Sequence, residues 1–348
     1  MSALNKTKKV KKLAEAFARV QTTAQLAQFL TIAPHQLRLL ADFPAYHCFT
    51  IPKNDGSSRY IEDPQKPLKK IQQQLNDALQ CGYFCHKTTA AYGFMINPAD
   101  DADPRNIRTN AQRHLGRPWL LNGDFEDFFH SISTDTVVEL LLTDKFSFDE
   151  PTALLLAQLT TFNGRLPMGA PTSPALSNWA MLTFDSELLD WAHQRSYIYT
   201  RFADDLSFSG AMPFSPQMLQ ELRSMAQVNG FRFNEQKFKI YSPKVEKIVT
   251  GLVVGQEAVA LPSGFVPELE GEIAKLQTVL EVQHRTGKTQ SVWVDKYRQQ
   301  IAGHLRFASF ILGDDHPQYR RLQHLLDIAN EPPNGYDSAS WLQFNYNF

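Results

Sequence analysis

The chain of 348 residues is poor in cysteine, with only Cys48, Cys81 and Cys85. So few cysteines exclude a disulfide framework and are typical of proteins that work in a reducing compartment. No apolar run approaches the length that spans a bilayer, and no apolar segment follows the lysine-rich N-terminus as it does in a secretion signal. The sequence therefore predicts a soluble, cytoplasmic protein that has no membrane partner.

An excess of either charge is also absent, since 35 Lys and Arg stand against 36 Asp and Glu. Proteins that bind nucleic acid neutralise phosphates with clustered basic residues, and here such clusters occur only locally, at residues 6–12 and 66–70. The first cluster is equally compatible with a solvated, frayed terminus. Repeats and low-complexity tracts are lacking too, so the composition predicts one large folded domain or two to three subdomains.

Two adjacent carboxylates, Asp204 and Asp205, lie between two apolar runs within residues 197–209. Alternating bulky residues on both sides predict a strand, a tight turn and a second strand, with the acids at the tip. Neighbouring carboxylates repel each other, so a folded chain tolerates them where water or a cation screens them. The tip is therefore a candidate site for a hard divalent ion, although Asp is also an ordinary turn residue.

A third carboxylate ends the apolar run Trp119–Asp124. If this run is a strand beside the hairpin, Asp124 lies next to Asp204 and Asp205. Three acids on neighbouring strand ends can hold two Mg²⁺ ions about 4 Å apart, the arrangement that polymerases use for nucleotidyl transfer.

Between these segments, a loop rich in Gly and Pro at residues 166–172 precedes a helical pattern. Ser173 is expected at the N-cap and Pro174 in the first turn. Apolar residues recur on one face and predict an amphipathic helix of about four to five turns, at Leu176, Ala180, Phe184, Leu188 and Trp191.

Together these segments resemble motifs A, B and C of reverse transcriptases, in the order of that family. The residues that carry the resemblance are Asp124 with Phe128 and Phe129, the loop Leu166–Pro174, and Phe202-Ala-Asp-Asp205. Three further pieces resemble the retron subgroup: Ala170–Asn178, Asn110-Ala-x-x-His114 and Val249-Thr-Gly251. The resemblance covers the chain from about Ile51 to about Val254.

This resemblance implies an α+β fold, the right-hand polymerase with fingers, palm and thumb, an antiparallel palm sheet and a helical thumb. The expected parts are an N-terminal helical extension at 1–48, fingers at 49–118, palm motif A at 119–136, a second part of the fingers at 137–170, palm motifs B to D at 171–255, and the thumb with a C-terminal tail at 256–348. The residue pattern also predicts a fingertip hairpin that turns at Asp55-Gly56, and thumb helices through Glu268–Val282 and Trp293–Leu312.

The resemblance places the catalytic centre on three carboxylates. The residues implied to bind two Mg²⁺ ions are Asp124, Phe125, Asp204 and Asp205, with the three aspartates as the catalytic residues.

The positions implied to bind the nucleotide are Lys53, Arg59, Phe129, Met168 and Lys237. Phe129 falls where the family keeps a steric gate against the ribose 2′-hydroxyl; the alternative is core packing beside Phe128. Met168 and Phe202 depart from the more usual Gln and Tyr. Lys237 could protonate pyrophosphate, or be a plain solvated charge.

The positions implied to bind RNA are Asn110, His114, Val249, Thr250 and Gly251. Asn110 and His114, four residues apart, would share one helix face. A structural hydrogen bond inside the fingers is an equal alternative for this pair.

The function implied is that of a retron RNA-directed DNA polymerase. It would copy part of a cognate structured non-coding RNA into single-stranded DNA from deoxynucleoside triphosphates, primed by an RNA 2′-hydroxyl so that the product is branched RNA–DNA. The family also implies antiphage defence with a separate effector protein. Because no RNase H segment can be placed in the sequence, we expect a host RNase H to remove the template.

Two alternatives stand beside it. One is another bacterial reverse transcriptase, of the group II intron or diversity-generating type. The other is a non-catalytic RNA-binding scaffold, against which the intact Asp124, Asp204 and Asp205 argue.

Overall fold

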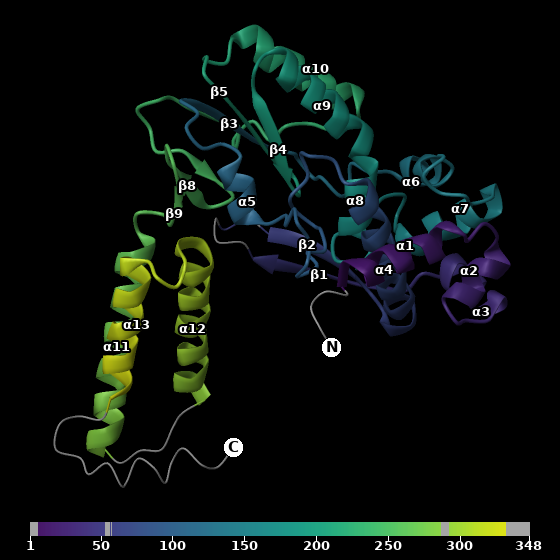
Figure 1. Cartoon of the computed structure of the whole chain (residues 1–348). Helices are drawn as coiled ribbons and strands as arrows, with labels where there is room; N and C mark the ends of the chain where they lie inside the picture. Colours follow the sequence, from purple (N-terminus) through teal and green to yellow (C-terminus); the bar gives the residue numbers. More distant parts are fainter. Residues whose placement is uncertain (1–5, 53–55, 57, 287–291, 332–348) are drawn as a thin grey trace. The chain divides into compact units, whose positions relative to one another are not determined.

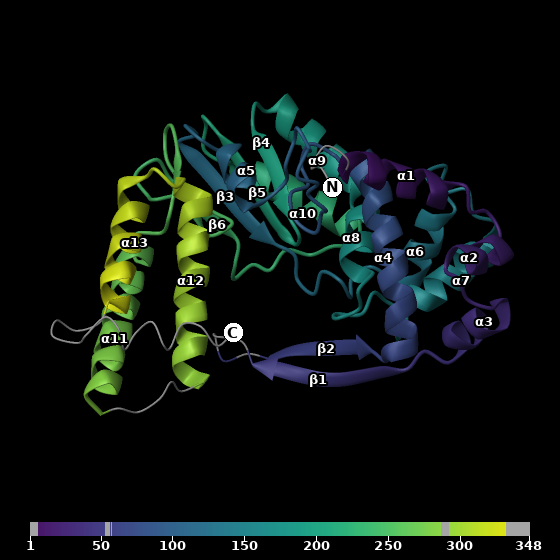
Figure 2. The ribbon, with the colours of Figure 1, turned by 60° about the horizontal axis from the view of Figure 1, so that its bottom comes forward.

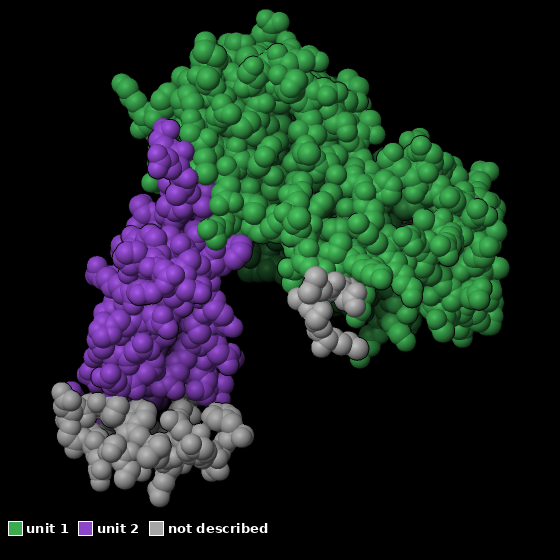
Figure 3. Space-filling view, in the orientation of Figure 1, with its two compact units in different colours: residues 1–250 green, residues 251–348 purple. Residues whose placement is uncertain are grey.

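The computed structural model describes residues 6–52, 56, 58–286 and 292–331. They belong to two compact units, residues 1–250 and residues 251–348 (Figure 1; Figure 3). No helix among the described residues is both long and apolar enough to cross a membrane.

Three helices open the first unit: α1 (Lys6–Ala18), α2 (Thr23–Phe29) and α3 (Pro34–Asp42). The start of α2 is fixed by a capping box, in which Thr22 accepts from the backbone of Gln25 and the Gln25 side chain reaches back. The N-terminal extension expected at residues 1–48 thus contains helices, but its last residues already belong to a strand.

A two-stranded antiparallel hairpin follows, made of β1 (Tyr46–Pro52) and β2 (Ser58–Pro64). Figure 2 shows it as a ribbon that projects from the start of α4 (Lys66–His86). Asp55, half of the expected turn, lies outside the described residues, while Gly56 has a φ of +82°. The end of β2 nearest α4 is buried, whereas most of β1 is exposed.

The centre of the first unit is a four-stranded sheet in the order β4-β5-β3-β6, with antiparallel neighbours throughout. Its strands are β3 (Trp119–Asp124), β4 (Ile198–Phe202), β5 (Asp205–Gly210) and β6 (Lys239–Tyr241). The predicted hairpin of β4 and β5 is therefore present, and β3 lies beside it. The short strand β7 (Ile248–Val249) ends this unit.

Six further helices belong to this unit, and α9 and α10 lie along one face of the sheet (Figure 1). They are α5 (Ile107–Gln112), α6 (Thr134–Leu141), α7 (Glu150–Thr160), α8 (Ser173–Ala180), α9 (Leu182–Gln194) and α10 (Pro216–Val228).

The helix expected after Ser173 is in fact the pair α8 and α9, separated at Met181. Thr172 rather than Ser173 is the N-cap, and the Ser173 hydroxyl instead donates to the carbonyl of Pro167 at 2.6 Å. The apolar repeat continues across the break because Met181 keeps helical dihedral angles, φ −78° and ψ −8°. Periodicity alone could not reveal the break.

The described residues of the second unit form β8 (Leu252–Val254), β9 (Val259–Ala260), α11 (Phe265–Thr286), α12 (Val292–Leu312) and α13 (Pro317–Asn330). Strand β8 pairs with β9, and the helices share a separate core that includes Leu276, Ile301 and Leu322. The two expected helices fall within α11 and α12, whereas α13 had no counterpart in the sequence analysis. The mixed helix and sheet content agrees with the α+β expectation.

Candidate active site

The structure brings the three predicted aspartates together at one end of the central sheet. The turn between β4 and β5 is Ala203-Asp204, and Ala203 has a φ of +60°, which is uncommon for a residue with a Cβ. The pairing of β3 with β5 puts Asp124 opposite Asp205. The N–H of Phe125 donates to the carbonyl of Asp204 at 3.2 Å, which ties the turn to the end of β3.

Two of the three carboxylates, those of Asp204 and Asp205, resist ionisation. Burial raises the pKa of Asp204, and the charge of Asp124 adds to the rise, while the positive charges of Lys237 and Arg59 oppose it. Burial of the carboxyl group, followed by repulsion from Asp204 and Asp124, raises the pKa of Asp205 to about 7, even though the residue as a whole is exposed. Three carboxylates in such proximity favour a bound cation.

Lys237 supplies one positive charge to this cluster. Its Nζ lies 2.9 Å from Oδ2 of Asp124, although its side chain is 57% exposed. The hydrogen bond to Asp124 raises the pKa of Lys237. The backbone N–H of Asn234 also donates to the carbonyl of Asp124 at 2.8 Å, so this lysine-bearing segment is anchored to the end of β3.

Among the described residues, no group of three or more His, Cys, Asp or Glu side chains has the arrangement needed to hold a metal ion. The donor set nevertheless fits Mg²⁺, because this ion keeps several waters and binds proteins through one or two carboxylates together with substrate phosphates. The ammonium of Lys237 on Asp124 occupies a position that a metal cation would favour.

Phe125, expected among the metal-binding positions, has its side chain in the core. It is 2% exposed, and its ring stacks on Phe128, Phe231 and Phe233 with centroid distances of 5.8, 4.9 and 5.3 Å. Only its backbone could contact a metal. The four stacked rings belong to the core of the first unit.

The two candidates for the sugar gate differ in exposure. Phe128 is buried in the core, whereas Phe129 is half-buried and stacks on Phe94 with a centroid distance of 5.7 Å. Phe94 itself has a φ of +55°. Of the two adjacent rings, only that of Phe129 presents substantial surface for a substrate.

Met168 is held by a residue that the sequence analysis missed, Glu62. The N–H of Glu62 donates to the carbonyl of Met168 at 2.8 Å, and its carboxylate accepts from the N–H of Met168 at 3.3 Å. Glu62 is 0% exposed and also contacts His130 at 3.0 Å and Arg165 at 3.4 Å. Its partners are distant in sequence, so no local signal marked it.

The two basic candidates of the hairpin have different outcomes. Arg59 is exposed on β2, and its charge acts on Asp204. Lys53 lies outside the described residues.

Asn110 and His114, expected to contact RNA, present almost no surface for it, since each is only 1% exposed. The ring nitrogens of His114 both lie 2.7 Å from hydroxyl groups, Nδ1 from Ser209 and Nε2 from Thr200. The pair also fails to share a helix face, because α5 ends before His114. The structural alternative applies to His114, which joins its segment to strands β4 and β5, whereas the buried Oδ1 of Asn110 has no hydrogen-bond partner among the described residues.

The three residues of the segment Val249-Thr-Gly251 also differ in the surface that they present. Val249 is 0% exposed, so its side chain cannot contact RNA. Thr250 has a φ of +48°, and its hydroxyl donates to the carbonyl of Ile107 at 3.0 Å. Gly251 has a φ of +77° and open space around it. Surface for a partner is therefore limited to Thr250 and Gly251.

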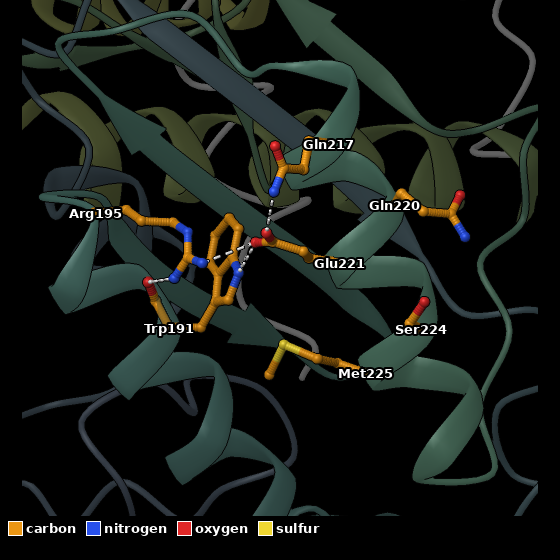
Figure 4. A pocket seen from close by; sticks show the side chains of 7 residues that line it. All are labelled: Trp191, Arg195, Gln217, Gln220, Glu221, Ser224 and Met225. Atoms are coloured by element: carbon orange, nitrogen blue, oxygen red, sulfur yellow. Dashed lines mark hydrogen bonds and ion pairs between the residues drawn. The ribbon is translucent and has the colours of Figure 1, made fainter.

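A pocket of about 550 Å³ between α9 and α10 is separate from this centre, and none of the predicted site residues lines it. Figure 4 shows the Glu221 carboxylate in its wall, which accepts from Trp191 at 3.0 Å and from Arg195 at 2.8 Å. The pocket has no part in the candidate catalytic centre.

Comparisons with known proteins agree with the geometry. The family described as "Reverse transcriptase (RNA-dependent DNA polymerase)" matches residues 51–265. The retron Mx162 reverse transcriptase of Myxococcus xanthus is 30% identical over 289 residues, which cover 73% of this chain but only 57% of that protein. The retron Ec86 reverse transcriptase of Escherichia coli is 29% identical over 301 residues, or 84% of each chain.

A telomerase of Candida albicans, solved in complex with a fragment of telomeric RNA, covers 88% of this chain at a TM-score of 0.43 and 10% identity, over 67% of its own length. At that TM-score the likeness carries no argument of its own. The sequence relatives are sufficient: this chain belongs to the reverse transcriptase (RNA-dependent DNA polymerase) family, and the retron enzymes are among its relatives, as the motifs indicated.

Proposed function

We propose that this protein is a retron-type RNA-directed DNA polymerase that works by two-Mg²⁺ nucleotidyl transfer. The observation that carries the proposal is the convergence of Asp124, Asp204 and Asp205 at one end of an antiparallel sheet, in a chain of this family. The scaffold alternative is less favoured, because a protein that only binds RNA has no need for three mutually repelling carboxylates.

The right-hand description is part of the proposal. The four-stranded sheet would be the palm, the β1–β2 hairpin the fingertips, and α11 and α12 the thumb. Arg59 on the hairpin would then contact the triphosphate, for which a bidentate guanidinium is well suited.

In the reaction, Asp124 and Asp204 would hold the two ions between them and Asp205 would be a peripheral ligand, as would the backbone of Phe125. Bound Mg²⁺ would lower the pKa of the attacking hydroxyl and neutralise the leaving pyrophosphate. Phe129 would exclude a ribose 2′-hydroxyl, with Phe94 holding its ring from behind. Lys237, whose Nζ already lies at the site, 2.9 Å from Asp124, would donate a proton to pyrophosphate.

The biological setting is proposed from the relatives. The protein would use its own structured non-coding RNA as template, start from an RNA 2′-hydroxyl and leave a branched RNA–DNA product in the cytoplasm. A host RNase H would trim the template, and a separate effector would complete an antiphage system.

One experiment tests both levels of the proposal. The protein is purified together with RNA from its native locus, and the nucleic acid is examined for DNA joined to RNA through a 2′ linkage. The double variant Asp204→Asn with Asp205→Asn should lower DNA synthesis by at least about 100-fold, because the metal site contributes several kcal/mol. Asp190→Asn, which removes an exposed carboxylate from α9, is the matched control.

Full synthesis by a folded double variant would refute the catalytic assignment. Synthesis on annealed templates without any branched product would instead favour another class of bacterial reverse transcriptase.

A further inference from the structure

A buried ion pair lies directly behind the catalytic turn. Arg201 on β4 and Asp185 on α9 are both 0% exposed and form a two-pronged contact, Nε to Oδ1 at 2.9 Å and Nη2 to Oδ2 at 2.7 Å. The hydroxyl of Tyr199 donates to the same Oδ1 at 2.9 Å. The carboxylate thus fixes the plane of the Arg201 guanidinium.

The remaining nitrogen of that guanidinium reaches the catalytic turn. Nη1 of Arg201 donates to the carbonyl of Ala203 at 2.9 Å. This carbonyl belongs to the peptide that joins Ala203 to Asp204, and Ala203 is the residue with the left-handed φ of +60°. Arg201 therefore holds the peptide group that orients the Asp204 carboxylate.

The same nitrogen also donates to Oδ1 of Asn178 on α8, at 3.0 Å. The amide nitrogen of Asn178 in turn donates to the carbonyls of Gly93 and Phe94, at 3.0 and 3.1 Å. Phe94 is the residue whose ring stacks on Phe129. Two side chains thus connect the metal-binding turn with the ring that lies behind the proposed sugar gate.

The chain around Gly93 is packed tightly against the same turn. A Cβ at Gly93 would lie 2.4 Å from the backbone nitrogen of Ala203, which no real side chain could do. The segment also exchanges backbone hydrogen bonds with Arg201, donating from Tyr92 at 2.8 Å and accepting at Ala90 at 2.8 Å. Movement of the turn must therefore move Phe94 as well.

Stability alone does not account for this arrangement. A buried ion pair gains about as much from attraction as it loses by desolvation, and well-packed apolar residues often replace such a pair without loss. What apolar residues could not supply is the directed hydrogen bond to the carbonyl of Ala203 and, through Asn178, to Gly93 and Phe94.

We propose that Arg201 and Asn178 are positioning residues that set, through one network, both the direction of the Asp204 carboxylate and the place of the Phe129 ring. Metal binding and sugar discrimination are then coupled properties of this enzyme. The inference deepens the proposed polymerase function, and the part that concerns sugar discrimination rests on that function.

The test compares three variants. Arg201→Lys keeps the charge beside Asp185 but cannot make the forked contact and reach Ala203 together. Asn178→Ser removes the bonds to Gly93 and Phe94 and the bond from Nη1 of Arg201, and it leaves the ion pair between Arg201 and Asp185. Tyr199→Phe is the control. It removes a buried hydrogen bond to the same Asp185 but leaves the contacts of Arg201 with Ala203 and of Asn178 with Gly93 and Phe94.

Four quantities are measured on each full-length variant: the kcat for single-nucleotide addition to an annealed primer–template, the ratio of deoxynucleotide to ribonucleotide incorporation, the dissociation constant for Mn²⁺ alone as a probe of the metal site, and the urea midpoint. Arg201→Lys should lower kcat by about 100-fold, the effect of a displacement of about 1 Å, and should weaken Mn²⁺ binding. Arg201→Lys and Asn178→Ser should both lower the ratio of deoxynucleotide to ribonucleotide incorporation, called here the sugar ratio, by about tenfold. Tyr199→Phe should change neither the sugar ratio nor Mn²⁺ binding.

A merely structural role would lower the urea midpoint of all three variants and leave the sugar ratio and Mn²⁺ binding at wild-type values, and this outcome overturns the inference. If Arg201→Lys does not fold, an unchanged sugar ratio in Asn178→Ser is sufficient to reject it. If the wild type itself adds no nucleotide, the proposed function fails, whereas equal Mn²⁺ binding by wild type and Arg201→Lys rejects the network separately.

Discussion

Mild acid should destabilise the first unit through one buried histidine. Burial, followed by the positive charges of Arg113 and Arg117, lowers the pKa of His114 to about 3, against about 6.5 in an unfolded chain. Between these values only the unfolded chain takes up the proton, so stability is lost as the pH falls below about 6.5. The loss reaches about 2 kcal/mol at about pH 5, since each pH unit below the unfolded pKa costs about 1.4 kcal/mol.

The loss can be measured by urea unfolding at about pH 7 and about pH 5, followed by tryptophan fluorescence. Three of the five tryptophans, Trp119, Trp179 and Trp191, belong to the first unit, and the contribution of the second unit is common to wild type and variants. In His114→Gln, whose side chain does not titrate, the decrease in unfolding free energy between the two pH values should be about 2 kcal/mol smaller than in the wild type. His193→Gln, which replaces an exposed histidine on α9, is the control and should keep the wild-type decrease.

Equal decreases in the wild type and in His114→Gln would refute the reasoning. So would a histidine ring signal, assigned to His114 by its absence from the variant, that titrates near the ordinary value in the folded protein.

Three further results are expected. Phe129→Val should raise ribonucleotide incorporation relative to deoxynucleotide incorporation by about tenfold or more, whereas Phe128→Val should lower stability without changing that ratio; identical ratios for both would assign Phe129 to the core. Asp205→Asn should raise the Tm of metal-free protein at about pH 8 by about 2–4 °C. A carboxyl group with a raised pKa lowers the stability of the folded protein as the pH rises through about 7, here by about 1 kcal/mol after screening by solvent, and the variant lacks this group. The gain in Tm should vanish at about pH 4, and a Tm unchanged at about pH 8 would contradict the prediction. Exchanging residues 251–348 for those of another retron enzyme should redirect which RNA is used for priming while extension of annealed primers persists; a chimera that keeps its original RNA preference would place recognition in the first unit.

The turn between β4 and β5 could be predicted from the sequence because its signals are local. Alternating bulky residues around Asp204 and Asp205 encode two strands, and adjacent acids favour a turn between them. The position of Asp124 opposite Asp205 depends on the order of the strands in the sheet. The residue pattern alone could not decide whether the strand that ends at Asp124 lies beside the hairpin, and the family resemblance implied that it does.

The sequence could not show which polar residues are buried, because their partners are distant in the chain. Glu62 meets Arg165 from 103 residues away, and His114 meets Ser209 from 95 residues away. A polar side chain in either segment is equally compatible with solvent until the tertiary contacts are known. The same reason explains why the sequence could not show that Asn110 and His114 are buried.

In the proposed two-Mg²⁺ site, the ion pair between Lys237 and Asp124 would make metal binding an exchange of one cation for another. A Mg²⁺ ion bound at Oδ2 of Asp124 would displace the ammonium that lies 2.9 Å from this atom, so the metal affinity would be the difference between two attractions rather than the strength of the metal contact alone. The displaced ammonium remains close by, because its segment is anchored through Asn234 to the end of β3. Metal binding at Asp124 would thus leave the Lys237 ammonium free to meet the negative charge of the nucleotide phosphates.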